Sequence, residues 1–135
     1  MQALTSFKSQ ITFLYYQEMA PVAAFFQEIL GLELVEDQGW ARIYRVAGAA
    51  FLGIVAGEKG FHAPRPENAV LVTLVVDDVT AWYERLRASG VEMLSQVQHR
   101  ADIQIRCFFF RDPGGYTFEV QQFLKPALAA ILGQA

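Results

Sequence analysis

The chain repeats one order of secondary structure, and this repeat constrains the fold more than any other feature of its sequence. In each half, an apolar strand-like run precedes a segment with apolar side chains at helical spacing, and three further strand-like runs follow. In the first half these elements are expected at residues 10–17, 19–30, 33–37, 40–47 and 49–56. In the second half they are expected at residues 70–76, between Asp78 and Gly90, and at 92–99, 103–111 and 116–123. The pattern therefore predicts two consecutive βαβββ units.

Both predicted helices carry residues that are typical of helix ends. Pro21 suits the first turn of a helix, and Gly31 suits the position just past the last turn. In the second half, Asp77 and Asp78 can cap the start of the helix, and Gly90 can close its end. These signals agree with the apolar periodicity and support both helix assignments.

A loop with two prolines and a glycine, residues 58–68, separates the two halves. A chain of 135 residues is long enough for one domain with a proper core and too short for two conventional domains. We therefore expect a single domain over residues 1–135. Its parts are a first module at about 10–57, the linker, a second module at about 69–124 and a tail at 125–135.

The predicted units define an α+β fold in which each helix covers one face of a curved mixed sheet. The other face has to meet a second βαβββ unit, from the same chain or from a partner. Two curved sheets that meet in this way would leave a cleft, where we expect the functional site. The open sheet faces and the apolar tail at residues 126–132 both need cover, so a homodimer is expected.

The composition argues against two classes of partner. The net charge is −3, whereas nucleic-acid binding requires a basic face. No run approaches the roughly 18 apolar residues of a membrane span, so no membrane association is expected. The single cysteine, Cys107, allows no internal disulfide and favours a cytoplasmic location. It lies in the apolar run IRCFFF, which indicates a packed core thiol.

The stretch FFFRDPGGYTFEV, residues 108–120, predicts a hairpin, because Asp-Pro-Gly-Gly separates two aromatic and β-branched runs. Glu119 lies in the second run, between Phe118 and Val120. Burial of an unpaired carboxylate is unfavourable by several kcal/mol, so Glu119 needs a partner or a function. It is a candidate metal ligand, general base or member of an ion pair, unless it faces solvent.

The register of this hairpin follows if Arg111 pairs with Tyr116 across the turn. Phe108 then lies opposite Glu119, and Arg106 becomes a diagonal neighbour of Glu119 on the same face. We therefore interpret Arg106 and Glu119 as an ion pair that lines the cleft. The guanidinium of Arg106 could also bind a carboxylate or phosphate of a ligand.

Alternation along the strands assigns further side chains to the cleft. Phe13 and Tyr15 of the first strand share the cleft face, together with Phe51. Phe51 lies on the same face as Gly53, where the missing side chain would leave room for a ligand.

Two further residues have a functional and a structural interpretation. Trp40 could stack on a flat ligand, or it could be a core aromatic. His62, in the linker, could contact a ligand or act as an acid or base, or it could be an ordinary surface histidine. The candidate ligand-binding residues are Phe13, Tyr15, Trp40, Phe51, His62, Arg106, Phe108 and Glu119.

Three stretches of the chain resemble the vicinal oxygen chelate superfamily of glyoxalases, bleomycin-resistance proteins and extradiol dioxygenases. They are AAFFQEILGLELVED, LVVDDVTAWYERLRASGV and RDPGGYTFEVQQF, and the resemblance extends over nearly the whole chain from residue 10 to 124. It implies paired βαβββ modules, usually in a homodimer, with a site inside each half-barrel. In metal-dependent members, it also implies one His or Glu type ligand from the first and last strand of each module.

Carried over position by position, this ligand pattern is mostly lost. The four positions fall on Ile11, Gly53, Leu71 and Glu119, and only Glu119 has a metal-binding side chain. Catalytic metal sites need about three protein ligands. We therefore expect no bound metal and no other cofactor.

Two functions of different classes remain open. The first is a metal-independent small-molecule-binding protein of the glyoxalase/bleomycin-resistance type, with its ligand in an apolar-aromatic cleft. The second is a glyoxalase-like lyase, isomerase or dioxygenase-type enzyme that uses Glu119 as its catalytic base or as a metal ligand. A third, a purely structural dimerisation module, is less favoured by a repeat with an evident cleft.

Overall fold

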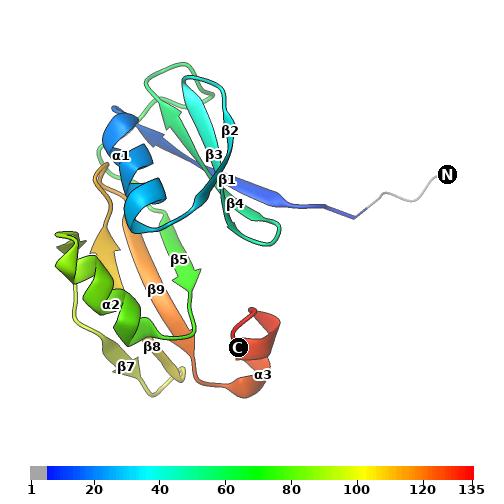
Figure 1. Ribbon diagram of the computed structural model, residues 1–135, viewed down its shortest axis with the longest axis vertical. Helices are drawn as coiled ribbons and strands as arrows, with labels where there is room; N and C mark the ends of the chain where they lie inside the picture. The colour runs from blue at the N-terminus through cyan, green and yellow to red at the C-terminus, as the bar shows by residue number, and fades with distance from the viewer. Residues whose placement is uncertain (1–5) are drawn as a thin grey trace. The chain divides into compact units, whose positions relative to one another are not determined.

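The computed structural model describes residues 6–135, and the chain divides into two compact units. The first unit ends at Pro66 and the second runs from Glu67 to Ala135, so the boundary falls inside the predicted linker. Each unit combines one mixed sheet with one principal helix (Figure 1). The predicted α+β fold is confirmed. None of the described helices is both long and apolar enough to cross a membrane.

The first unit contains β1 (Gln10–Tyr16), α1 (Ala20–Ala24), η1 (Phe25–Ile29), β2 (Glu33–Asp37), β3 (Ala41–Ala47) and β4 (Ala50–Ala56). Its four strands lie in the order β1-β4-β3-β2. β1 and β4 are parallel, whereas β2, β3 and β4 form antiparallel pairs. The parallel pair requires a crossover, and the helix supplies it.

The predicted helix at 19–30 forms, but its second half is wound as a π-helical turn, η1. The amide of Leu30 donates to the carbonyl of Phe25, five residues back, at 3.0 Å. Gly31 ends the helix at a φ of 71°, which glycine adopts without steric cost. Phe25 and Phe26, at the start of this turn, are both buried.

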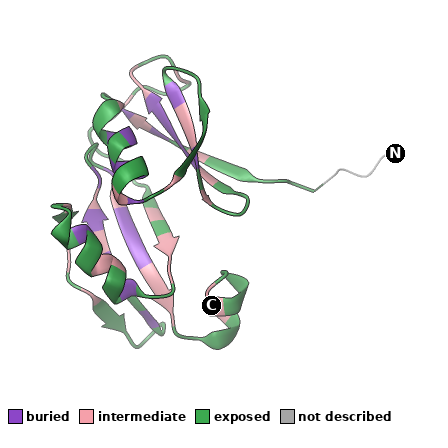
Figure 2. Ribbon diagram, in the orientation of Figure 1, coloured by how far each residue is buried: buried purple, intermediate pink, exposed green. Residues whose placement is uncertain are grey.

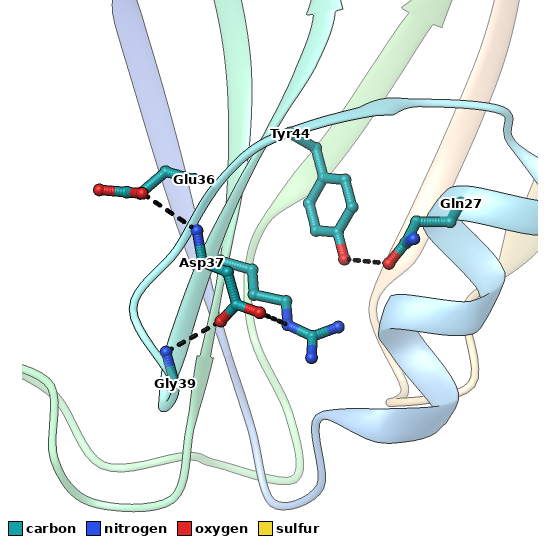
Figure 3. Close-up of polar contacts among 6 residues, drawn as sticks. Gln27, Glu36, Asp37, Gly39 and Tyr44 are labelled. Carbon is teal, nitrogen blue, oxygen red and sulfur yellow. Dashed lines mark hydrogen bonds and ion pairs between the residues drawn. The ribbon is translucent and has the colours of Figure 1, made fainter.

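Tyr44 of β3 lies in the core of the first unit. Its ring makes an edge contact with Phe26, with the centroids 5.4 Å apart. Its hydroxyl donates to Oε1 of Gln27 at 2.9 Å (Figure 3). A buried phenol requires such a hydrogen-bond partner. Its contacts with Phe26 and Gln27 therefore explain Tyr44 as a structural residue of the core.

The second unit contains β5 (Leu71–Val75), α2 (Val79–Ala88), β6 (Glu92–Met93), β7 (Gln98–Arg100), β8 (Ile105–Arg111), β9 (Thr117–Phe123) and α3 (Pro126–Ile131). The strand order is β5-β9-β8-β6, and β7 also pairs with β8. β5 and β9 are parallel, and the other pairs are antiparallel. Asp78 caps α2 as predicted, because its side chain accepts a hydrogen bond from the amide of Ala81 at 3.1 Å.

The prediction of one continuous strand at 92–99 is wrong, because the chain leaves the ladder between β6 and β7. In this gap the amide of Phe109 donates to Oγ of Ser95 at 3.0 Å. A side-chain hydroxyl thus replaces a backbone carbonyl where the strand is interrupted.

Asp112 closes the turn between β8 and β9. Its buried Oδ1 accepts hydrogen bonds from the amides of Gly114 at 3.0 Å and Tyr116 at 2.8 Å. The amide of Asp112 also donates to the carbonyl of Tyr116 at 3.0 Å. As a result Arg111 pairs with Thr117, one residue away from the predicted register.

The core of the second unit lies between α2 and the sheet. Phe108, Phe110 and Phe118 are fully buried there, and Tyr83 of α2 contacts Phe108 edge-on at 5.3 Å between centroids. Phe110 and Phe118 stack across the β8–β9 ladder at 5.1 Å. The buried stretches of both strands are purple in Figure 2.

The chain after α3 returns to its own unit through Gln134. The side-chain Oε1 of Gln134 accepts a hydrogen bond from the amide of Phe123 at 2.7 Å, and its Nε2 donates to the carbonyl of Phe123 at 3.1 Å. The amide of Ala135 donates to Oδ1 of Asp77 at 2.7 Å. The helical turns predicted for the tail form as α3, and the residues beyond them are fixed by these three bonds.

Candidate functional site

Glu119 lies on the open face of the second sheet, the face turned away from α2. Alternation along β9 places Phe118 and Val120 on the helix side and Glu119 on the other, as predicted. In the ladder, Glu119 lies between Phe109 of β8 and Thr73 of β5. The site is therefore built on three adjacent strands.

The side chain of Glu119 is only 5% exposed. Oγ1 of Thr73 donates a hydrogen bond to its Oε1 at 2.9 Å, and the thiol of Cys107 lies near enough to the carboxylate for Glu119 to raise the pKa of the thiol. We call these three residues the Glu119 cluster. Among residues 6–135, every ion pair involves a different carboxylate. Glu119 is thus a buried acid with only neutral groups beside it. Burial of a carboxylate without a positive partner is unfavourable, so a role in packing alone does not explain this residue.

Cys107 is buried, as predicted for a packed core thiol, but it also contacts the candidate site. Burial, together with the charge and the hydrogen bond of Glu119, raises the pKa of the Cys107 thiol above its usual value of 9.0. The thiol therefore keeps its proton at neutral pH and is uncharged beside the carboxylate. The sequence did contain a signal for this contact, because Cys107 shares a strand face with Phe109, opposite Glu119.

The predicted ion pair between Arg106 and Glu119 is wrong. Arg106 pairs with Gln122 of β9, whereas Glu119 pairs with Phe109. A shift of one residue in the ladder places Arg106 on the opposite face of the sheet, where it is exposed. Phe108 shares that face and is fully buried in the core, so its predicted role as a ligand contact opposite Glu119 is wrong as well.

The described residues do not supply the donors of a catalytic metal centre. No group of three His, Cys, Asp or Glu side chains in this part of the chain could hold an ion. Cys107 and Glu119 are the two metal-binding side chains of the cluster, and Thr73 adds a hydroxyl. About three protein ligands are needed, so the donor set does not fit a divalent catalytic metal.

The first sheet has an apolar and aromatic open face. Phe13 and Tyr15 of β1 lie on it, and Ile11 pairs there with Phe51 of β4, so the predicted face of the three aromatic residues is confirmed. Ile11 and Phe13 are each 40% exposed. The guanidinium of Arg45 lies over the Phe51 ring, 4.9 Å from its centroid.

Gly53 does not leave room for a ligand, contrary to the expectation from its missing side chain. A Cβ at this position would collide with the ring of Phe13, which pairs with Gly53 across the β1–β4 ladder. The glycine is needed because an aromatic ring from the neighbouring strand lies directly on it.

His62 packs on the same open face through Tyr15. The two rings meet edge-on with centroids 5.3 Å apart. The ring of Phe61, the preceding residue, also meets the His62 ring edge-on, with centroids 4.9 Å apart. Gly60 allows this approach, since a Cβ there would lie 2.6 Å from Cγ1 of Val55 and 2.9 Å from the Tyr15 ring. The structure thus brings together two of the predicted ligand-binding residues, Tyr15 and His62.

Trp40 precedes β3 instead of lying within it. Its ring is partly exposed, and its carbonyl accepts a hydrogen bond from the amide of Ala56 at 2.9 Å. The backbone of Trp40 is therefore fixed to the end of β4, while the partly exposed ring can still make contacts.

A family model described as the Glyoxalase/Bleomycin resistance protein/Dioxygenase superfamily matches residues 9–120. This match covers both units and most of their strands. No curated protein matches the chain significantly.

Solved structures share the fold at low sequence identity. Lactoylglutathione lyase from Agrobacterium tumefaciens is 19% identical, with 85% of this chain and 92% of that chain covered and a TM-score of 0.68. The fosfomycin resistance protein FosX from Listeria monocytogenes is 18% identical, with 91% and 97% covered and a TM-score of 0.70. TioX from Micromonospora sp. ML1 is 15% identical, with 87% and 99% covered and a TM-score of 0.70.

Proposed function

Because the chain belongs to the glyoxalase/bleomycin resistance protein/dioxygenase superfamily, we propose that it is a small-molecule-binding protein that works without a metal ion. Its ligand lies on the open, helix-free face of the second sheet, where the Glu119 cluster presents hydrogen-bonding groups. One of the similar structures, also of this superfamily, is named as a fosfomycin resistance protein.

The observation that carries the proposal is the Glu119 cluster. Thr73 donates to the carboxylate, the neutral thiol of Cys107 lies near it, and no Lys, Arg or His of the described chain neutralises it. A carboxylate accepts about four hydrogen bonds, so it retains capacity for a donor group of a ligand. A ligand donor at this position would supply the interaction that the fold leaves out.

The open face of the first sheet is a separate apolar and aromatic surface of the first unit, and it suits an apolar ligand group. Ile11 and Phe13 remain 40% exposed there, beside Tyr15 and Phe51. Exposed apolar side chains that gather on one sheet face are typical of a binding surface.

Native mass spectrometry of the purified protein tests the proposal. We expect a small molecule that travels with the protein and is lost on denaturation. Glu119→Gln should reduce its occupancy, whereas Glu67→Gln, which removes an exposed carboxylate elsewhere in the second unit, should not. Equal ligand occupancy in the two variants would show that Glu119 does not contribute to binding.

Elemental analysis of protein prepared without chelators tests the metal-independent part. We expect well below one equivalent of zinc, nickel, manganese or iron, because the donor set offers fewer than the roughly three ligands required. A stoichiometric metal that disappears in Glu119→Ala would contradict this part of the proposal.

An enzymatic function is the second candidate, and the same cluster favours it. Thr73 holds a buried carboxylate in position by a hydrogen bond on an open sheet face, and a catalytic base likewise has to be positioned. One similar structure is a lactoylglutathione lyase, an enzyme of the same superfamily. Once a ligand is identified, its turnover by the wild type and not by Glu119→Gln would favour this candidate.

We further propose that the protein is a homodimer. The large apolar side chains of Ile11, Phe13 and Leu71, and of Phe61 at 90% exposure, are left exposed, and such side chains are often covered in an oligomer. Light scattering at micromolar concentration should give a mass near twice the 15.1 kDa of the chain. A single species at the monomer mass would contradict the dimer.

A further inference from the structure

A cavity of about 430 Å³ opens at the carboxyl end of β5, within the second unit. Val75 and the residues that follow it form one wall, the first turn of α2 with Trp82 forms the second, and the chain after α3 forms the third. The cavity shares no residue with the Glu119 cluster. Its volume lies in the range of small-molecule sites.

The third wall is held in place by specific hydrogen bonds. Gln134 lines the cavity and is fixed by its two bonds to the backbone of Phe123. The amide of Ala135 then donates to Asp77, on the opposite side of the opening, at 2.7 Å. The C-terminal segment therefore forms one wall of the cavity, and hydrogen bonds to Phe123 and to Asp77 anchor this segment on both sides.

The charged side chains that line the cavity are all acidic. Asp77 and Asp78 line it, and its walls contain no Lys, Arg or His. Oδ1 of Asp77 is used by Ala135, and Oδ1 of Asp78 is used by the cap of α2, while neither residue belongs to an ion pair in the described chain. Each aspartate therefore retains acceptor capacity for a positively charged group.

The remaining surface is apolar and aromatic. Val75, Ala81 and Trp82 contribute it, and the guanidinium of Arg85 lies over the Trp82 ring, 4.8 Å from its centroid. An aromatic ring next to two carboxylates suits a ligand with an apolar body and a cationic end.

We propose that this cavity is a binding site for small organic cations, with a protonated amine held by Asp77 and Asp78 and an apolar group placed against Val75 and Trp82. The site is separate from the proposed function, because it uses other residues on another part of the unit. A ligand bound here also contacts Gln134, so its occupancy is coupled to the anchoring of the C-terminal segment.

The test uses Trp82 as the reporter. The chain has two tryptophans, so Trp40→Phe leaves Trp82 as the sole source of tryptophan emission. The probe is 2-phenylethylamine, which is protonated at pH 7, and the matched neutral probe is 2-phenylethanol. We expect saturable changes in Trp82 emission with the amine, and affinity about tenfold or more above that for the alcohol.

Two sets of variants locate the binding. Asp77→Asn/Asp78→Asn keeps both hydrogen-bonded oxygens and removes both charges, so the preference for the amine should fall to about unity. Glu84→Gln removes an exposed carboxylate of α2 outside the cavity walls and should leave the titration unchanged. Circular dichroism checks that the variants are folded, and Asp77→Asn alone serves if the double variant is not.

Three results would overturn the inference. They are the absence of a saturable response to the amine, equal affinities for the amine and the alcohol, and an unchanged amine preference in the folded aspartate variants. None of them affects the proposed function, which depends on Glu119. Conversely, loss of the Glu119-dependent ligand would leave the amine titration as it is.

Discussion

The hydroxyl of Thr73 donates a hydrogen bond to Oε1 of Glu119 across the parallel β5–β9 pair, over 2.9 Å. Thr73→Val removes this donor and keeps the shape of the side chain. The buried carboxylate then loses this hydrogen bond, so we expect the free energy of unfolding to fall by about 1–3 kcal/mol. Chemical denaturation measures the change. Thr117→Val, on the same sheet face, is the matched control and should have a smaller effect.

A double-mutant cycle compares Thr73, which donates to Glu119 in the structure, with Arg106, which lies on the opposite face of the sheet. Thr73→Val and Glu119→Gln should be coupled, with an interaction energy of about 0.5–3 kcal/mol. Arg106→Met and Glu119→Gln should be additive within about 0.5 kcal/mol, because the two residues lie on opposite faces of the sheet. A large coupling between Arg106 and Glu119 would mean that the β8–β9 register differs from the one described.

Gly53→Ala tests the close contact between β4 and Phe13. The added methyl group collides with the ring of Phe13, which has to move because no rotamer of alanine avoids it. We expect a destabilisation of about 1–3 kcal/mol, as for other overpacked sites. The same substitution in a Phe13→Ala background should have little effect. If Gly53→Ala is equally destabilising in both backgrounds, the ring is not the cause.

The titration of Cys107 predicts a loss of stability at high pH. Burial and the Glu119 carboxylate raise the pKa of the native Cys107 thiol, so the native protein holds this proton at pH values where the unfolded chain has lost it. The thiol's contribution to the free energy of unfolding is therefore complete below the usual pKa of 9.0 and decreases as the pH rises toward the native pKa.

Denaturation curves from about pH 8 to about pH 10 measure this effect. The wild type should lose more stability over the interval than Cys107→Ala, in which the thiol is absent. Glu119→Gln removes the charge that contributes to the shift and should reduce the loss. Parallel curves for the wild type and Cys107→Ala would show that the thiol does not titrate differently in the two states.

The order of elements could be predicted from the sequence because local signals and periodicity agree. Gly31 and Gly90 end their helices at φ values of 71° and 78°, and Asp78 forms the predicted cap. These are interactions between near neighbours in the chain, and their residue types are specific. The interruption between β6 and β7 does not follow from local signals, because it involves a hydrogen bond between Ser95 and the amide of Phe109, 14 residues further along the chain.

The hairpin register could not be predicted from alternation. Asp112 binds the amides of Gly114 and Tyr116, which places Tyr116 opposite Asp112 and leaves a loop closed by Gly115 at a φ of 98°. A side-chain hydrogen bond thus decides between two registers that have the same apolar pattern. The difference of one residue was enough to misplace Arg106.

The candidate site was predicted in part for a similar reason. The faces of Glu119 and Phe13 follow from strand alternation, which needs no knowledge of the neighbours. The partners of Glu119 depend on which strands are adjacent, and β5 and β9 are distant in the chain. The surroundings of Gly53 could not be predicted for the same reason, because the glycine in the sequence does not reveal that the ring of Phe13 fills the space beside it.

The hydrogen bonds of Gln134 have a consequence for the edge of the second sheet. β5 ends at Val75, so the last residue of β9, Phe123, has no neighbouring strand on that side. The primary amide of Gln134 supplies one acceptor and one donor to Phe123, as a residue of a paired strand would. Unpaired strand edges are templates for aggregation. The C-terminal segment thus covers the end of β9 beyond the last residue of β5, and removal of Gln134 would leave the backbone amide and carbonyl of Phe123 open to pairing with another chain.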